Sequence, residues 1–172
     1  MTRQESTSLV IRKAEIRDHN AIWHILEPVY RAGETYCIDR GISREDALSD
    51  WFGAPFTVFV AELDGRVLGT SHIGANRGGG GAHVANAGFA TAPEARGQGV
   101  AAGLVRQAQK WARMQGFRAM QFNFVVSTNE GAVRVWERAG FDIVGRLPGA
   151  FRHPGKGYVD ALIMYCDLIK DS

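Results

Sequence analysis

The chain has 172 residues, of which 45% are hydrophobic and 22% are charged, and its formal net charge is +2. This length and composition are typical of a single globular domain with a sizeable core. The charge is too small to indicate binding to nucleic acid or to a membrane surface, and no apolar run is long enough to span a membrane. Cys37 and Cys166 lie far apart, without the spacing of metal ligands or of a disulfide framework, so we expect a cytoplasmic protein without a metal.

The N-terminal part begins with a polar segment. Residues 1–8 predict a flexible tail before a single domain over residues 9–170. Alternating polarity over residues 9–16 predicts the first strand, and an apolar stripe downstream predicts a helix. Asp18 is placed as the N-cap of that helix, and Pro28 is expected to kink it or to restart the turn.

The next elements are a short helix and three strands. Ser43 and Asp46 form a capping-box pattern that predicts the start of the helix, and Gly53 predicts its end. The three strands are expected over residues 56–63, 67–74 and 83–91. Asp64 and Gly65 predict a hairpin turn between the first two strands, and four consecutive glycines predict a flexible loop between the second and the third.

The C-terminal part alternates helices and strands. We expect a helix from residue 99 to 116, a buried strand over 117–126, a helix that begins at Asn129, and strands over 141–146 and 157–168. A long polar and aromatic excursion should separate the last two strands. The resulting order, β, α, α, β, β, β, α, β, α, β, β, predicts an α/β (α+β) fold with helices on both faces of a mixed sheet.

A glycine loop organises the chain, because it lies between a predicted strand and a predicted helix. Its residues are Arg96, Gly97, Gln98, Gly99, Val100 and Ala101. Glycine lets a backbone come close to a ligand, and the first N–H groups of a helix lack intrahelical partners and attract anions. The loop therefore predicts a phosphate or pyrophosphate site, with a plain glycine turn that caps the helix as the alternative.

Two families have loops of this kind, and the first binds dinucleotides. Its fingerprint is matched by Gly97, Gly99 and Ala102. That fingerprint also requires an acidic residue at the end of the next strand, where it binds a ribose hydroxyl. The next strand, over residues 117–126, contains no Asp or Glu and is followed by Ser-Thr-Asn. A nicotinamide dinucleotide is therefore disfavoured.

The second family is the GNAT superfamily of N-acetyltransferases, whose acetyl-CoA loop reads R/Q-x-x-G-x-G/A. Arg96, Gly99 and Ala101 match it in full. The family's second signature, N-x-x-A-x-x-x-Y-x-x-x-G-F, resembles a segment that begins 33 positions later and contains Asn129, Ala132, Trp136, Gly140 and Phe141. Two linked motifs at the family's spacing are far more specific than one. The chain resembles this family from about residue 8 to 168.

The resemblance implies a GNAT fold, with a mostly antiparallel sheet of about seven strands, and direct transfer of an acetyl group from acetyl-CoA to an amine. It also implies that the strand before the loop separates from its neighbour, eased by a bulge at Gly88, so that its backbone pairs with pantetheine and one N–H polarises the thioester carbonyl. The implied acetyl-CoA contacts are Phe89, Ala90, Thr91, Arg96, Gly97, Gln98, Gly99, Val100, Ala101, Asn129 and Trp136.

Trp136 is the clear departure from the family, which usually has Tyr at this position as the acid that protonates the leaving thiolate. An indole N–H donates a hydrogen bond but does not ionise usefully. Two interpretations stay open. A thiol with a pKa of about 8.5 leaves readily enough as a thiolate that hydrogen bonds suffice, or the protein binds acetyl-CoA without catalysis.

Three asparagines, Asn86, Asn123 and Asn129, lie on the elements that should flank the cofactor. Strands disfavour Asn, and a buried Asn needs hydrogen-bond partners, which neighbouring backbone could supply. The surrounding phrases resemble a GNAT subgroup that includes fungal enzymes acting on proline analogues. We hypothesise that Asn86 or Asn123 orients the substrate or the thioester, and that Asn129 donates a hydrogen bond to the departing sulfur.

The general base and the acceptor pocket are less defined. Glu34 and Tyr36 lie where GNAT proteins place the acceptor, between the first two helices. Glu34, His83, Asp160 and a water relay are all open as the base, although His83 should point away from Asn86 by strand alternation. Further candidate pocket walls, each equally compatible with plain packing, are Phe151, His153 and Tyr158.

The sequence thus predicts an acetyl-CoA-dependent N-acetyltransferase that acts on a small primary or secondary amine, such as an amino acid, an analogue or an amine toxin. The alternatives are an inactive acyl-CoA-binding or sensing module and a protein or peptide N-acetyltransferase. Homodimers are common in the family, so a homodimer is a further expectation.

Overall fold

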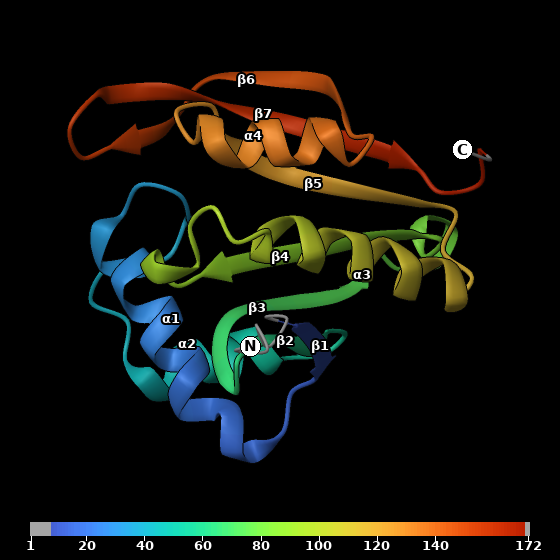
Figure 1. The fold of residues 1–172 in the computed structure, drawn as a ribbon. Coiled ribbons are helices and arrows are strands. Elements are labelled where there is room, and N and C mark those ends of the chain that lie inside the picture. Colours follow the sequence, from blue (N-terminus) through green and yellow to red (C-terminus); the bar gives the residue numbers. More distant parts are fainter. Residues whose placement is uncertain (1–7, 171–172) are drawn as a thin grey trace, which may run out of the picture.

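The computed structural model describes residues 8–170, so the predicted flexible tail lies outside the described residues except for Ser8. The observed elements follow the predicted order (Figure 1): β1 (Leu9–Lys13), α1 (His19–Ala32), α2 (Arg44–Phe52), β2 (Thr57–Leu63), β3 (Arg66–Ala75), β4 (Val84–Thr91), α3 (Val100–Met114), β5 (Ala119–Val126), α4 (Glu130–Arg138), β6 (Asp142–His153) and β7 (Gly157–Asp167). Short 3₁₀ turns precede α1, β4 and α3.

The seven strands form one sheet in the order β1-β2-β3-β4-β5-β7-β6. Only the β4–β5 pair is parallel, which confirms a mixed, mostly antiparallel sheet. Trp51 of α2 donates a hydrogen bond to Thr70 of β3, whereas Val100 of α3 packs over Gly69 of the same strand. Because successive strand residues face opposite sides, α2 and α3 lie on opposite faces of the sheet.

The β4–β5 pair separates soon after it forms. Only Val84 with Ala119 and Ala85 with Met120 are paired, after which β4 stays with β3 and β5 stays with β7. Figure 1 shows the two strands close at the start of β5 and apart at the loop before α3. The remaining residues of β4 therefore present an unpaired edge toward β5.

Two glycines seat α3 on the sheet. A Cβ on Gly69 of β3 would lie 2.7 Å from Val100 Cγ1 and 2.9 Å from Leu104 Cδ1. A Cβ on Gly103 of α3 would lie 2.6 Å from Leu9 Cδ2 of β1. Because neither glycine has a side chain, the first turns of α3 pack directly on the strands. This contact fixes the position of the N-terminal end of α3 on the sheet.

Several local predictions near α1 need correction. The first strand ends at Lys13 rather than at residue 16, and α1 continues through Pro28 without restarting. Asp18 precedes α1 as predicted, but its side chain does not cap that helix. Its carboxylate instead accepts hydrogen bonds from the Arg12 guanidinium, at 2.7 and 2.9 Å, and from the Glu15 backbone N–H at 2.7 Å. These bonds, led by those from Arg12, lower the Asp18 pKa.

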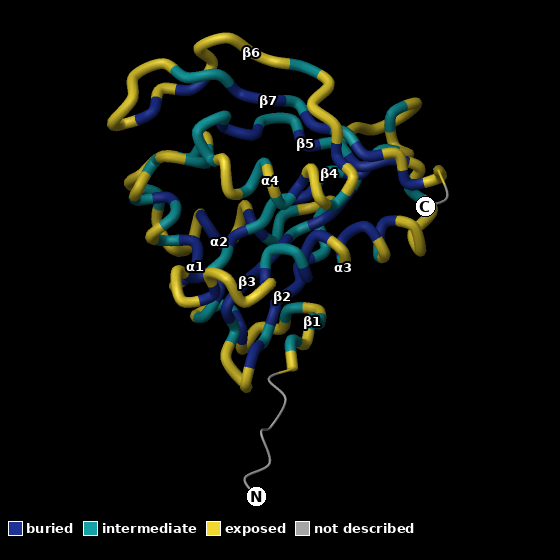
Figure 2. The backbone as a smooth tube through the Cα atoms, turned by 45° about the horizontal axis from the view of Figure 1, so that its top comes forward, coloured by how far each residue is buried: buried dark blue, intermediate teal, exposed yellow. Residues whose placement is uncertain are grey.

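The predicted excursion over residues 147–156 is also wrong, because β6 continues as far as His153 and keeps pairing with β7. A register shift between Leu147 and Phe151 accommodates Pro148 and Gly149. Proline is tolerated there since β6 is the edge strand, and Figure 2 shows it as mostly exposed. Within residues 8–170, no helix is long and apolar enough to cross a membrane.

Candidate active site

A cavity of about 1130 Å³ lies where β4 and β5 separate. Its walls come from the loop between α1 and α2, from β3, β4 and β5, from the start of α3, and from α4. The sequence-predicted residues that line it are Glu34, Tyr36, Asn86, Phe89, Ala90, Thr91, Arg96, Gly97, Gly99, Val100, Ala101, Asn123, Asn129 and Trp136. Among the implied acetyl-CoA contacts, Gln98 is the one that is not part of the wall.

The glycine loop presents free N–H groups at one end of this cavity. Gly97 and Gly99 have φ values of 75° and 74°, which side chains disfavour. The backbone N–H of Arg96 donates to Pro93, and that of Gln98 donates to Ala95. The N–H groups of the two glycines form no backbone hydrogen bond within residues 8–170, so they and the first turn of α3 can bind an anion.

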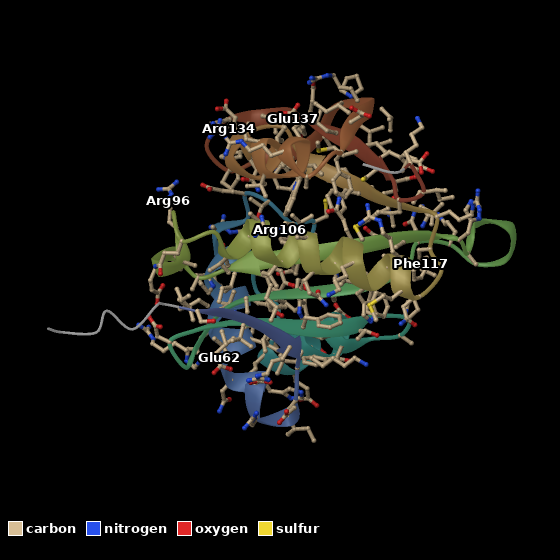
Figure 3. The ribbon with its side chains drawn as sticks, turned by 45° about the vertical axis from the view of Figure 1, so that its right-hand side comes forward. Glu62, Arg96, Arg106, Phe117, Arg134 and Glu137 are labelled. Atoms are coloured by element: carbon tan, nitrogen blue, oxygen red, sulfur yellow. The ribbon has the colours of Figure 1, made fainter. Side chains whose placement is uncertain are left out.

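Arg96 adds positive charge next to these groups. It is exposed, and Figure 3 shows its side chain extending from the loop that precedes α3. Since this side chain is at the cavity wall, it can reach an anion bound by the loop without itself being fixed by the protein.

The open edge of β4 is occupied at Phe89 by a side chain. The Phe89 N–H donates to the Tyr36 hydroxyl at 3.0 Å, and that hydroxyl donates to the Phe89 carbonyl at 2.6 Å. Both backbone groups of Phe89 therefore point away from β3, and by strand alternation those of Ala87 and Thr91 face the same edge, whereas those of Ala90 face β3. Burial raises the pKa of the Tyr36 hydroxyl well above its usual value, so it stays protonated.

The predicted bulge at Gly88 is wrong, because the β3–β4 register runs without a shift from Gly69 to Ala75. The register shift occurs instead in β5, between Phe122 and Val125, where it pairs with β7. Gly88 has a different function. A Cβ at this position would lie 2.5 Å from His72 Nε2, so only glycine leaves room for the imidazole that crosses over from β3.

His72 is a cavity residue that the sequence reasoning missed. Its ring is stacked between Trp51 and Phe56, with both pairs of ring centroids 4.1 Å apart. Nδ1 lies 3.2 Å from the Trp51 carbonyl oxygen, and because a carbonyl only accepts, Nδ1 carries the hydrogen and Nε2 keeps a lone pair. Burial lowers the His72 pKa to about 4, so the ring is neutral at pH 7. The sequence gives no signal for this position, because the pairing of His72 with Gly88 depends on the β3–β4 register.

The three asparagines differ in how they are bonded. Asn123 donates to Asn76 Oδ1 at 2.6 Å and accepts from Gln121 Nε2 at 2.9 Å, so its amide belongs to a side-chain network. Asn129 precedes α4 as predicted, but its side chain does not cap the helix. The side chains of Asn86 and Asn129 form no hydrogen bond within the described part of the chain, and both line the cavity.

Trp136 closes the cavity from α4. It is only 8% exposed and contacts Phe89 and Phe122, with ring centroids 4.8 and 5.2 Å away. Because Phe89 belongs to β4 and Phe122 to β5, this aromatic cluster joins the two separated parts of the sheet.

The remaining candidates lie apart from this centre. Glu34 is exposed at the cavity wall, and His83 is exposed and outside the cavity. Asp160 accepts hydrogen bonds from the Gly149 N–H at 2.9 Å and from Arg146 at 2.8 Å. These bonds, led by that from Gly149, lower its pKa and give it a structural role.

Phe151 and His153 line a second cavity of about 600 Å³, whereas Tyr158 is 75% exposed. The second cavity also contains Tyr36 and Cys37, so it adjoins the first. No cluster of His, Cys, Asp or Glu suited to a metal ion occurs among residues 8–170.

Comparisons with known proteins agree on one family. The Acetyltransferase (GNAT) family matches residues 19–141. The N-acetyltransferase aca1 of Schizosaccharomyces pombe is 33% identical over 149 residues, which cover 76% of this chain and 71% of the yeast protein.

Two solved structures extend the comparison. A GCN5-related N-acetyltransferase from Kribbella flavida is 42% identical, with a TM-score of 0.89 over 92% of this chain and 97% of that one. A phosphinothricin acetyltransferase from Sinorhizobium meliloti, in complex with acetyl-CoA, is 20% identical, with a TM-score of 0.82 over 92% of this chain and 88% of that one. The second likeness shows the fold alone.

The lowered pKa of His72 predicts a pH dependence of stability. The folded pKa of about 4 lies below the ordinary value of 6.5, so on acidification the unfolded chain binds this proton first. The free energy of unfolding should therefore fall by up to about 3 kcal/mol between pH 6.5 and 4 because of His72, with no contribution above pH 7. Urea unfolding of the wild type and of His72→Gln at several pH values in this range measures the effect. An equal change of the free energy of unfolding with pH in both proteins would contradict it.

Proposed function

The chain belongs to the acetyltransferase (GNAT) family and is an N-acetyltransferase, and from this premise we propose that it transfers the acetyl group of acetyl-CoA to a small amine. The observation that carries the proposal is the open edge of β4, which leads from the glycine loop to Phe89 along a single cavity. A pyrophosphate needs the N–H groups at one end of this path, and a thioester needs a hydrogen-bond donor at the other.

Acetyl-CoA is proposed to bind in an extended conformation along this edge. Its pyrophosphate accepts hydrogen bonds from Gly97, Gly99 and the first turn of α3, with Arg96 adding charge. Its pantetheine amides pair with the outward backbone groups of Thr91 and with the Phe89 carbonyl, as an added strand would, which leaves the Phe89 N–H for the thioester. Ala90 contributes only its buried side chain, because its backbone groups face β3.

The proposed reaction is a direct transfer. The amine nitrogen attacks the thioester carbonyl carbon, a C–N bond forms, and the carbonyl oxygen becomes an oxyanion that accepts the Phe89 N–H. The C–S bond then breaks and CoA leaves as a thiolate. Asn129 and Trp136 line this part of the cavity, and both have N–H groups that can donate to the sulfur. Trp136 cannot supply a proton to the sulfur. Because a thiol has a pKa of about 8.5, CoA can leave as a thiolate without a general acid.

The proposed acceptor is a small amine that carries an acidic group. The second cavity adjoins the first at Tyr36, and Arg40 and Arg152 are among the residues that line it. Its volume of about 600 Å³ accommodates a molecule of amino-acid size. Two guanidinium groups favour a carboxylate or a phosphinate there, which supports an amino acid or an analogue as the acceptor.

Release of CoA from acetyl-CoA, detected with a thiol reagent, tests this function. The acceptors are L-amino acids, proline analogues, phosphinothricin, simple amines and a short peptide with a free N-terminus. We expect release above background hydrolysis with amino acids or their analogues, and none with the peptide. Saturable acetyl-CoA binding without release by any acceptor would instead indicate a binding module, and release with the peptide alone would indicate a peptide N-acetyltransferase.

Tyr36 and acetyl-CoA should compete for the backbone groups of Phe89. Removing the hydroxyl in Tyr36→Phe removes the competitor, whose net contribution is about 1 kcal/mol for one hydrogen bond. We expect acetyl-CoA to bind the variant roughly three- to tenfold more tightly in isothermal titration. Tyr30→Phe, at a buried tyrosine whose ring contacts that of Tyr36 edge to face, is the matched control and should not change affinity. Weaker binding by Tyr36→Phe would contradict the competition.

Asn129 should act on the departing sulfur rather than on cofactor affinity. A hydrogen bond to a charged group contributes about 1.5–3 kcal/mol, so Asn129→Ala should lower kcat by roughly 10- to 100-fold. The Kd of acetyl-CoA should change little, because the sulfur is uncharged before the transfer. Asn20→Ala, on α1 outside the cavity, is the control. Full turnover by Asn129→Ala would show that the residue does not have this role.

A further inference from the structure

We propose that His72 is the general base of the transfer, and that its Nε2 accepts the proton that the attacking amine loses. This inference rests on the proposed function and assigns the role that the sequence left open. It follows from three features of the structure, which are the direction of Nε2, the fixed tautomer of the ring, and the position of His72 beside the expected oxyanion donor.

Nε2 is directed over Gly88 into the cavity. Both Nε2 and the Tyr36 hydroxyl lie close to the point that a Cβ of Gly88 would occupy, at 2.5 and 3.4 Å. Gly88 is paired with His72 across the strands and is followed directly by Phe89. His72 Nε2 and the Phe89 N–H therefore border the same part of the cavity, over Gly88. An amine has to bind there to attack the carbonyl carbon of the thioester.

The surroundings hold the imidazole in the state that a base requires. Trp51 and Phe56 stack on its two faces, and the Trp51 carbonyl fixes the hydrogen on Nδ1. Gly88 and the uncharged Tyr36 hydroxyl complete these surroundings, and no charged group contributes to the lowered pKa of His72. The imidazole is thus neutral before the transfer, with an available lone pair on Nε2. The imidazolium that forms when it accepts the proton is stabilised by the neighbouring oxyanion.

The alternative bases fit less well. Glu34 is exposed at the cavity wall, so its carboxylate is in contact with solvent. His83 lies outside the cavity, and Asp160 is already bonded to Arg146 and to the Gly149 N–H. His72 alone among these combines a cavity position with a fixed ring orientation.

The proton balance of the step is complete. As the C–N bond forms, the amine nitrogen loses one proton to Nε2, and as the C–S bond breaks, the electron pair leaves with the sulfur. The imidazolium then returns its proton to the thiolate, directly or through water. The products are an N-acetylated amine, CoA thiol and neutral His72, so no other reactant is needed.

His72→Ala and His72→Gln test the proposal with the acceptor that gives CoA release in the wild type. General-base catalysis is worth roughly 10²–10⁴-fold, so we expect kcat to fall at least 100-fold while the Kd of acetyl-CoA stays unchanged. His72→Ala leaves a slot between Trp51 and Phe56, and added imidazole should restore turnover in a saturable way. His72→Gln should not be rescued, because its amide fills the slot and accepts no proton. His83→Gln is the matched control and should keep full activity.

The outcomes separate this inference from the proposed function. If the wild type transfers acetyl groups and the folded His72 variants do so equally well, His72 is not the general base, while the proposed function stands. The same holds if imidazole fails to restore the activity of His72→Ala. If the wild type transfers to no amine, both are overturned. Nitrogen NMR of the imidazole gives a readout that needs no acceptor. We expect hydrogen on Nδ1 and a bare Nε2 between pH 6 and 8, and the opposite tautomer would contradict the proposal.

Discussion

The separation of β4 from β5 is the constraint on which the rest of this structure depends. Two residue pairs hold the strands together before they diverge, and the unpaired edge that results must find hydrogen-bond partners. At Phe89 a single hydroxyl, that of Tyr36, satisfies both the N–H and the carbonyl. The edge is therefore kept in a strand conformation without a strand beside it, and a ligand with amide groups can replace the hydroxyl.

The core explains how the sheet can open and still remain one body. Phe89, Phe122 and Trp136 pack across the gap from β4, β5 and α4, so an aromatic contact takes over where backbone pairing ends. Trp at position 136 thus has a packing function that a smaller ring would fulfil less well. Next to this cluster, Gly69 and Gly103 bring α3 against the sheet and fix the glycine loop relative to β4.

Local patterns predicted most of the architecture, and contacts between distant segments account for what they missed. The order of elements and the glycine loop were predictable because periodicity, caps and turn residues act within a few positions. The roles of Gly88 and His72 were not, because they depend on which residues of β3 and β4 face each other. The continuation of β6 through Pro148 was missed for the same reason, since it depends on pairing with β7 along an open edge.

The most direct test of this account is the mapping of backbone amide signals by NMR during titration with acetyl-CoA, with NADH as the comparison. We predict saturable shifts at Thr91, Phe89, Gly97 and Gly99 with acetyl-CoA and none with NADH. These positions trace the edge of β4 and the loop before α3. Shifts confined to other elements, or an equal response to NADH, would contradict the claim that acetyl-CoA binds in the gap between β4 and β5.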